Sequence, residues 1–182
     1  MLTGNDCVEE FTSWLLDGTH QGAIVIAHNL RGYYRFLLCG PFYKKLLQPK
    51  LILSGAEIMS MELEEAEIKF PDSLNFLPMP LKALPKTFGL TELKKDYFPH
   101  FFNRKENQTY VGALPPVEDY DSDNLSDKER KKFLAWYEEL KTEEHLFDFE
   151  EEIEEYCRSD VDILRRCCLK FKQLMEETAG SI

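Results

Sequence analysis

The C-terminal part of this chain predicts one long amphipathic helix whose apolar face contains a carboxylate. Between Phe149 and Glu177, apolar residues recur at the three- and four-residue spacing of an α-helix, which marks a face that must be buried. The predicted face consists of Ile153, Tyr156, Cys157, Asp160, Leu164, Cys167, Phe171 and Leu174. A buried carboxylate is costly unless a metal ion or a hydrogen-bond donor compensates it, so Asp160 needs one or the other.

Tyr156 lies one turn before Asp160 on the same predicted face, so its hydroxyl and the carboxylate converge. Such a pair suits a metal-bound water and a scissile phosphate. The alternative is a structural aspartate held by hydrogen bonds, and the Tyr-x-x-x-Asp spacing taken alone favours that alternative.

Short apolar runs in the first half of the chain predict strands. Gly22–Ala27 is a β-branched run bounded by glycine, which is typical of a strand buried on both faces. Three further runs, separated by turn residues, predict an antiparallel meander over Lys50–Leu53, Glu57–Leu63 and Glu67–Phe70. Two helices are expected over Cys7–Leu16 and Arg35–Leu47, the second interrupted or bent around Gly40 and Pro41.

The middle of the chain predicts less regular structure. Pro71–Pro85 contains four prolines and is expected to be extended, and Thr87–Leu93 is expected to form a short helix. An irregular insertion packed over the domain is predicted at about residues 98–125. Ser126 then opens a capping box with Glu129, which predicts a helix running through Lys141.

Length and composition favour one globular domain over residues 1–182, since 43% of the residues are apolar and no linker divides the chain. The five cysteines include no C-x-x-C pair, so neither a zinc knuckle nor a disulfide framework is indicated. No apolar run is long enough to span a bilayer, and the first residues do not resemble a secretory signal. We therefore expect an intracellular protein, with the nucleus as the candidate compartment.

The net charge of −11 is local, because Glu118–Asp160 contains 17 acids against 6 bases. In contrast, the segment from His28 to Ala56 contains no acid. It includes a basic stretch formed by Arg31, Arg35, Lys44, Lys45 and Lys50. A basic stretch can follow a phosphate backbone through counterion release. The alternative is a solvated helix face, which charge alone favours.

Five sequence strings together resemble the 3′–5′ exonuclease domain of protein-primed family B DNA polymerases, most closely the polymerases of Polinton (Maverick) transposons. They occur in the family's order and together span nearly the whole chain, from residue 27 to residue 171. The strings are AHNLRGY (27–33), GAEIMSMEL (55–63), DSLNFLPMPL (72–81), LPKTFGLTELKKDYFPHFFN (84–103) and EYCRSDVDILRRCCLKF (155–171). The resemblance implies DNA replication as the setting, nucleotidyltransferase as the enzyme class and a mixed α/β, ribonuclease-H-like (DnaQ-like) fold.

The resemblance assigns roles to individual residues. Asn29 and Tyr33 correspond to single-strand contacts of the second exonuclease motif, whose metal-binding Asp is replaced here by Tyr34. Ser73 and Leu74 match a Ser-Leu motif that contacts single-stranded DNA and the priming protein. Further matches are Lys94 with Tyr97, where the lysine would stabilise developing charge at the phosphate, and Tyr156 with Asp160, the catalytic pair of the third motif, in which Asp160 is the metal ligand.

The family uses Mg²⁺ or Mn²⁺, and this chain offers few of the necessary carboxylates. The Asp-x-Glu of the first exonuclease motif has no counterpart, because Asp6, Glu9 and Glu10 have the wrong spacing. Two divalent ions about 4 Å apart need several carboxylates, so we expect none to be bound productively. We also expect the ribonuclease-H-like fold to be incomplete, with its opening strands missing and an exposed inner sheet edge.

Three functions remain open. The first is a catalytically inactive, transposon-derived exonuclease-like domain, a pseudoenzyme, that binds single-stranded DNA through Asn29, Tyr33, Ser73 and the basic stretch. The second is a fragment of an active DNA polymerase with 3′–5′ exonuclease activity, although this chain contains no polymerase palm motif. The third is a domesticated interaction module that binds a protein through the acidic segment or the open sheet edge.

Overall fold

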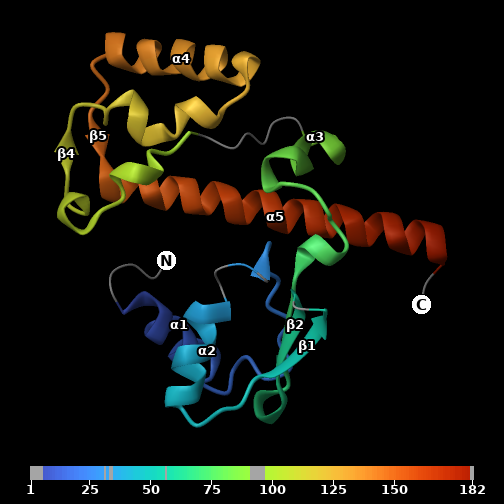
Figure 1. Ribbon diagram of the computed structural model, residues 1–182. Coiled ribbons are helices and arrows are strands. Elements are labelled where there is room, and N and C mark those ends of the chain that lie inside the picture. Colours follow the sequence, from blue (N-terminus) through green and yellow to red (C-terminus); the bar gives the residue numbers. More distant parts are fainter. Residues whose placement is uncertain (1–5, 31, 33–34, 56, 91–96, 181–182) are drawn as a thin grey trace. The chain divides into compact units, whose positions relative to one another are not determined.

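The computed structural model describes residues 6–30, 32, 35–55, 57–90 and 97–180 (Figure 1). These residues form two compact units, Met1–Leu81 and Lys82–Ile182, which we call the N-terminal and C-terminal units. The predicted α/β class is confirmed, since helices combine with small antiparallel sheets. A single domain over residues 1–182 stays a prediction. Among the described residues, no helix combines the length and apolar content that a bilayer span requires.

The N-terminal unit is built on the predicted meander, which is confirmed. Strands β1 (Lys50–Ser54), β2 (Glu57–Leu63) and β3 (Ile68–Pro71) form an antiparallel sheet in that order, with a bulge between Ile52 and Leu53. Helices α1 (Cys7–Leu15) and α2 (Arg35–Lys44) contact each other. The core of the unit consists of Leu15, Leu30, Phe42, Met61, Leu63, Ile68 and Phe70.

Helix α2 differs from its prediction at its C-terminal end. It contains Pro41, as expected, but ends at Lys44 instead of Leu47. Leu46 has a positive φ of 60°, a left-handed conformation that a helix cannot contain.

The expectation that Gly22–Ala27 is a strand buried on both faces is wrong. This segment runs parallel to β3 through two isolated bridges, Ile24↔Lys69 and Ala27↔Asp72. Val25 and Ala27 pack against the core, whereas Ile24 is 66% exposed and Ile26 is 40% exposed. The described residues cover only one face of the segment, so its side chains alternate between core and solvent. No described residue accepts a backbone hydrogen bond from the amide of Ile24 or Ile26, on the edge away from β3.

The two long helices of the C-terminal unit, α4 (Asp127–Thr142) and α5 (Phe149–Ala179), confirm their predictions. The hydroxyl of Ser126 accepts the amide of Glu129 at 3.4 Å and caps α4. The carboxylate of Asp148 accepts the amides of Glu150 and Glu151 at 3.0 and 3.3 Å and caps α5. Both caps satisfy amides that the first helical turn leaves without an acceptor.

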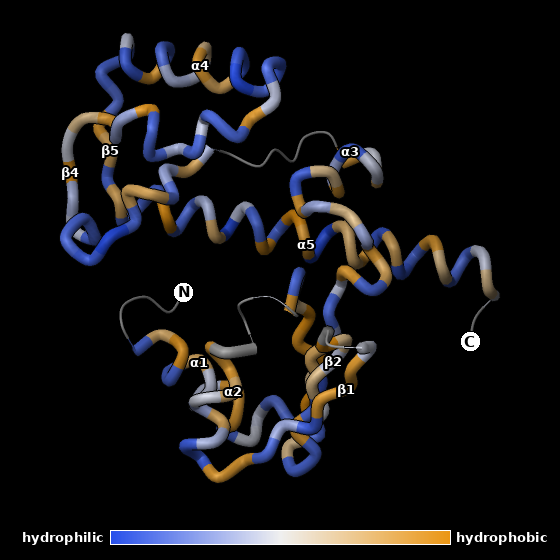
Figure 2. The backbone as a smooth tube through the Cα atoms, in the orientation of Figure 1, coloured by the Kyte–Doolittle hydropathy of each residue, from blue (hydrophilic) through white to orange (hydrophobic). Residues whose placement is uncertain are grey.

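The buried face of α5 differs in part from the predicted one. Figure 2 shows apolar and polar residues alternating along this helix. Phe149, Ile163 and Cys167 are buried, but the sequence pattern did not identify Ile163. Cys157 is exposed and Leu174 is 42% exposed, although both were placed on the face. Cys157 lies beside the line of buried and half-buried positions 149, 153, 156, 160, 163 and 167, and the helix is exposed from residue 172 to its end, which includes Leu174.

Two aromatic clusters form the core of the C-terminal unit. The first contains Phe98, Phe147 and Phe149, and the second contains Tyr120, Phe133 and Tyr137. Leu114 packs against both of them. Burial raises the pKa of the Tyr120 phenol, which keeps that side chain neutral. The chain around the clusters forms four 3₁₀ turns (His100–Phe102, Lys105–Asn107, Val117–Tyr120, Ser122–Asn124) and the paired strands β4 (Val111–Gly112) and β5 (Phe147–Asp148).

The short helix expected at Thr87–Leu93 lies elsewhere. Helix α3 spans Leu84–Thr87 and begins with Pro85 in its first turn. Proline suits this position because its fixed φ is helical and its missing amide is not needed there. Gly89 follows with φ of 69°, which terminates the helix, and residues 91–96 lie outside the described part of the chain. The prediction assigned Pro85 to an extended segment and therefore placed the helix too late.

Phe133→Ala should lower the free energy of unfolding by about 4 kcal/mol, because it leaves a cavity in a tightly packed aromatic cluster. The Phe133 side chain is 0% exposed and its ring centroid lies 5.1 Å from that of Tyr97. The matched control is Leu134→Ala, which truncates a neighbouring side chain that is 37% exposed and should cost less than about 1 kcal/mol. Urea unfolding followed by circular dichroism measures both changes, and equal losses would contradict this assignment of the core.

Candidate nucleic-acid interface

A buried carboxylate joins two of the segments that were predicted to contact nucleic acid. Asp72 is 1% exposed, and its Oδ1 accepts the amide of Asn29 at 2.9 Å and the amide of Leu74 at 3.0 Å. The structure therefore brings together the backbones of Asn29, Ser73 and Leu74, which lie on distant parts of the sequence. Hydrogen bonds to a charged acceptor are stronger than neutral ones, so this junction should be firmly held.

Asn29 is the exposed member of the three residues whose backbones meet at Asp72. Asn29 has φ of 69°, a left-handed conformation that asparagine adopts more readily than most residues, and it is exposed. A Cβ added at Gly32 would lie 3.1 Å from Asn29 Nδ2, so glycine leaves room for this amide. The result is an exposed amide on a fixed backbone, which can donate to or accept from a nucleotide.

Ser73 has a different position from the predicted one, since its side chain is fully buried. Its hydroxyl donates to the carbonyl of Ala27 at 2.9 Å and lies 2.8 Å from Nδ1 of His28. The other ring nitrogen of His28 lies 3.1 Å from the carbonyl of Met79. In this conformation Ser73 supports the junction from inside, and its role in contacting DNA stays a prediction.

The protons of this network can be counted. Ser73 has one hydroxyl proton, so while it donates to Ala27 the Nδ1 of His28 must donate to the Ser73 oxygen. The carbonyl of Met79 only accepts, so Nε2 must donate as well. All three bonds coexist only when both ring nitrogens of His28 carry protons. With a neutral ring, the Ser73 hydroxyl donates to Nδ1 and its bond to Ala27 is lost. The carbonyl of Ala27 then still accepts the backbone amide of Ser73 at 2.8 Å.

The basic stretch is partly neutralised. Lys44 forms an ion pair with Glu9, and Lys50 forms one with Glu64 at 2.7 Å. The hydrogen bond between Lys44 and Glu9 lowers the pKa of the carboxyl and raises the pKa of the ammonium, and the bond from Lys50 to Glu64 raises the pKa of Lys50. Lys45 donates to the hydroxyl of Ser13 at 3.1 Å.

Several predicted contacts cannot be placed on this surface. Arg31 and Tyr33 lie outside the described residues, as does Tyr34, and so does Lys94 of the C-terminal unit. Arg35 begins α2, but its side chain is not among the described ones. Their assigned contacts stay predictions.

The Tyr-x-x-x-Asp pair lies on α5 in the C-terminal unit. The ring of Tyr156 packs 5.0 Å from Phe98, and its hydroxyl lies 3.4 Å from Nε2 of His100. Asp160 is half-buried with one carboxylate oxygen shielded from solvent. Within the described ranges, no group of three or more His, Cys, Asp or Glu side chains is arranged to hold a metal ion. The described residues therefore do not supply the set of carboxylates that a pair of divalent ions requires.

Sequence reasoning missed three participants: Asp72, His28 and His100. Asp72 lies within the DSLNFLPMPL string and His28 begins the acid-free stretch, so both were quoted without a role. His100 gave no signal, because its contact with Tyr156 joins residues that are 56 positions apart.

Comparison with known proteins identifies the family. The family model for DNA polymerase type B, organellar and viral, matches residues 19–181. The chain belongs to this family. Its relatives include the DNA polymerase of Kluyveromyces lactis, which is 26% identical over 96% of this chain and 18% of its own length. The probable DNA polymerase of Ascobolus immersus is 30% identical over 80% of this chain and 13% of its own length.

A phage enzyme extends the family likeness. The DNA-directed DNA polymerase of Enterobacteria phage PRD1 is 38% identical over 44% of this chain and 13% of its own length. The chain thus spans less than a fifth of the length of these three relatives. No solved structure matches it.

Asp72→Ala should destabilise the N-terminal unit by about 3 kcal/mol, because two backbone amides lose a charged acceptor in a buried site. Asp72→Asn keeps one oxygen acceptor and should cost about half as much. The matched control is Asp17→Ala, since the Asp17 carboxylate also accepts an amide, that of Thr19 at 2.8 Å, but in an exposed turn. Denaturant unfolding compares the three variants, and an Asp72→Ala protein as stable as the Asp17→Ala protein would refute the anchoring role.

Proposed function

We propose that this chain is the exonuclease-type region of a protein-primed type B DNA polymerase of the Polinton (Maverick) kind, that it does not cleave DNA, and that it binds single strands. The family match and the order of the five motif strings support the first part. An incomplete ribonuclease-H-like fold is part of the same proposal. Such a domain would act as a pseudoenzyme derived from a transposon, with the nucleus as the proposed compartment.

The observation that carries the binding proposal is the bridge made by Asp72. It fixes the backbone of Asn29 beside that of Leu74 and leaves the Asn29 amide exposed. Leu74 is half-buried, so part of its side chain is available to an unstacked base. Single-stranded nucleic acids are bound by such combinations of polar contacts, apolar or aromatic platforms for bases, and basic groups for phosphates. Tyr33, Arg31 and Arg35 would supply the platform and charges.

The proposed absence of cleavage follows from the shortage of carboxylates that could bind metal ions. Tyr34 stands where the second exonuclease motif has an aspartate, and a phenol does not replace a carboxylate in balancing two divalent ions. If Mg²⁺ or Mn²⁺ binds at all, Asp160 is the ligand that the family motif assigns, with Tyr156 and Lys94 beside the phosphate. One carboxylate would hold a single ion weakly.

A second candidate is a working part of an active, longer DNA polymerase. The observation in its favour is that the chain spans 18% or less of its type B relatives, which leaves room for other activities in sequence beyond these 182 residues. In that case the same surface would guide a strand without cutting it.

Asn29→Asp should weaken binding of a fluorescein-labelled oligothymidylate about tenfold, because it places a negative charge beside a phosphate while asparagine and aspartate tolerate the same left-handed backbone. Gln48→Glu is the matched control, since it makes the same amide-to-carboxylate change at another exposed position and should have little effect. Tyr33→Ala should also weaken binding, by about 1 to 3 kcal/mol if the ring stacks on a base. Fluorescence anisotropy at low salt measures all four proteins. Wild-type protein that fails to bind at low salt would overturn the proposal.

Incubation with Mn²⁺ and a 3′-ended single strand should give no degradation above that of an Asp160→Ala control. Tyr34→Asp alone should not produce cleavage, because the other carboxylates of the site are still lacking. Gel electrophoresis of a 5′-labelled strand provides the readout. Wild-type degradation that is abolished by Asp160→Ala would assign an active nuclease and refute the pseudoenzyme proposal.

A further inference from the structure

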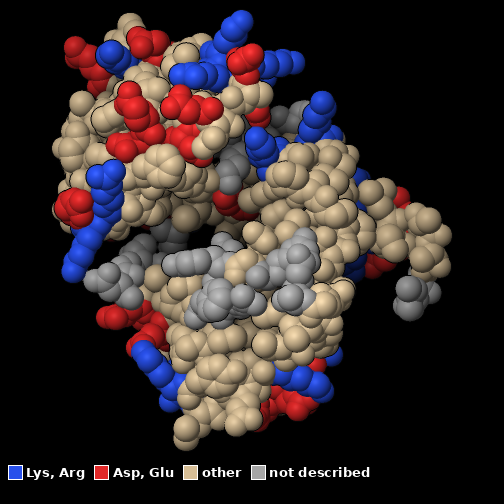
Figure 3. Space-filling model, viewed as in Figure 1, with Lys and Arg blue, Asp and Glu red and all other residues tan. Residues whose placement is uncertain are grey.

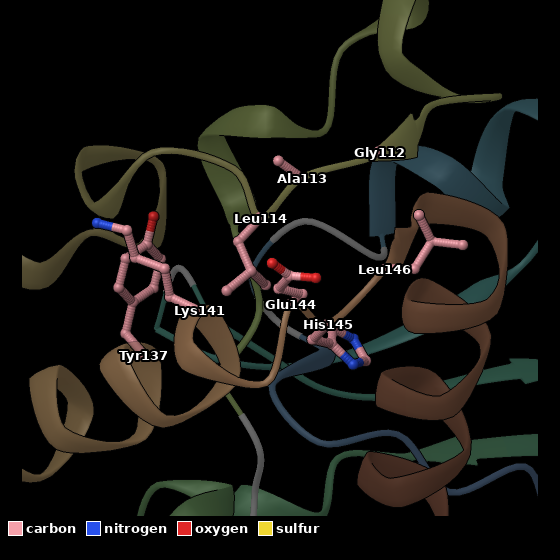
Figure 4. A pocket seen from close by; sticks show the side chains of 8 residues that line it. All are labelled: Gly112, Ala113, Leu114, Tyr137, Lys141, Glu144, His145 and Leu146. Atoms are coloured by element: carbon pink, nitrogen blue, oxygen red, sulfur yellow. The ribbon is translucent and has the colours of Figure 1, made fainter.

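A cavity of about 400 Å³ lies within the C-terminal unit, and neither Tyr156 nor Asp160 lines it (Figure 4). One wall comes from the segment after β4 and the other from the end of α4 and the turn before β5. The lining residues are Gly112, Ala113, Leu114, Tyr137, Lys141, Glu144, His145 and Leu146. None of them was assigned a function by the sequence motifs.

The cavity exists because a two-stranded ladder stops early. β4 and β5 pair at Val111↔Asp148 and Gly112↔Phe147, and the next pair in this register would be Ala113 with Leu146. These two residues instead line the cavity on separate segments. The amides of Leu114 and Leu146 donate no hydrogen bond to another described residue. An open end of a ladder with unused amides can accept an added extended segment.

The walls are fixed by specific contacts. The hydroxyl of Tyr137 donates to the carbonyl of Pro115 at 3.0 Å, which ties the segment after β4 to α4. His145 lies 2.8 Å from the carboxylate of Glu152 on α5, which holds the turn. Leu114 packs into both aromatic clusters and forms a rigid part of the wall. The cavity is therefore preformed, which reduces the entropic cost of binding.

The cavity has exposed apolar surface and lies in an acidic part of the sequence. Leu146 lines the cavity and is 66% exposed, so a large apolar side chain of the lining reaches solvent. Residues 138–155, which include the turn, contain ten acids and one base, Lys141. Figure 3 shows acidic side chains gathered on the visible face of this unit. This charge repels nucleic acid and attracts cationic groups.

We propose that this cavity binds an extended, basic segment of a partner protein, which inserts one large apolar side chain between Ala113 and Leu146. The apolar walls select the inserted side chain, the open end of the ladder selects an extended backbone, and the acidic surroundings select lysine and arginine on either side. The inference is independent of the proposed DNA binding, because it uses other residues in the other unit.

The test uses the full chain and fluorescein-labelled pentapeptides in an anisotropy titration. The peptide Lys-Arg-Leu-Arg-Lys should bind, and Lys-Arg-Ala-Arg-Lys should bind about tenfold more weakly, since burying a leucine side chain is worth about one order of magnitude or more in affinity. Equal affinities for the two peptides would overturn the proposal, because they would indicate attraction to the acidic surface alone. No binding of either peptide at low salt would overturn it as well.

Two matched pairs of variants locate the site. Ala113→Trp fills the cavity and should weaken binding of the leucine peptide about tenfold, whereas Ala135→Trp on the exposed side of α4 should not. Glu144→Lys should weaken binding more than Glu143→Lys, which makes the same charge change at a residue that does not line the cavity. Circular dichroism and urea unfolding confirm the fold of each variant. An Ala113→Trp protein that is folded and binds the leucine peptide like wild type would refute the assignment.

Discussion

The carboxylate of Asp72 holds the junction between β3 and the segment Gly22–Ala27, because it accepts a backbone amide at the point where β3 offers no further carbonyl. The amides of Val25 and Ala27 donate to the carbonyls of Lys69 and Pro71 at 2.8 and 3.4 Å. The next amide on the same side, that of Asn29, donates to the side chain of Asp72 instead. The parallel pairing is thereby extended by one bond at the point where the backbone of Asn29 turns into the left-handed region. Asp72 Oδ1 also accepts the amide of Leu74, so removing this carboxylate would release both segments together.

This arrangement explains which features the sequence could predict. Helices α4 and α5 were predicted because their periodicity and their first residues are local signals. The covered face of Gly22–Ala27 could not be predicted, since a run of apolar residues does not tell how many neighbours it will have. The junction also escaped prediction in its details, because Asp72 and His28 act on residues that are 43 to 51 positions away along the chain. The motif resemblance named two segments that meet at Asp72 in the structure, but the side chain of Ser73 is buried there and its DNA contact stays a prediction.

The match of Tyr156 and Asp160 to a sequence motif does not by itself show a metal-binding site. The ring of Tyr156 packs between Phe98 and His100, with centroid distances of 5.0 and 5.4 Å, so it has a structural role that needs no metal ion. Asp160 lies one turn further along the same helix face, between Tyr156 and the buried Ile163. Their presence is therefore compatible with a domain that keeps its packing after losing its metal ligands, and cleavage has to be argued from the full set of carboxylates.

The ion pairs of the N-terminal unit limit how DNA could be held there. Phosphate binding gains its salt-dependent free energy from cations that exchange small counterions for phosphates. Lys44 and Lys50 already face Glu9 and Glu64, so a phosphate would have to displace these carboxylates or accept weaker attraction. A single strand on this unit would therefore owe more of its affinity to stacking and to polar contacts such as that of the Asn29 amide than to charge. Such binding would depend on salt less steeply than binding through lysine–phosphate contacts alone, and it would tolerate the net charge of −11 better than a purely electrostatic binder.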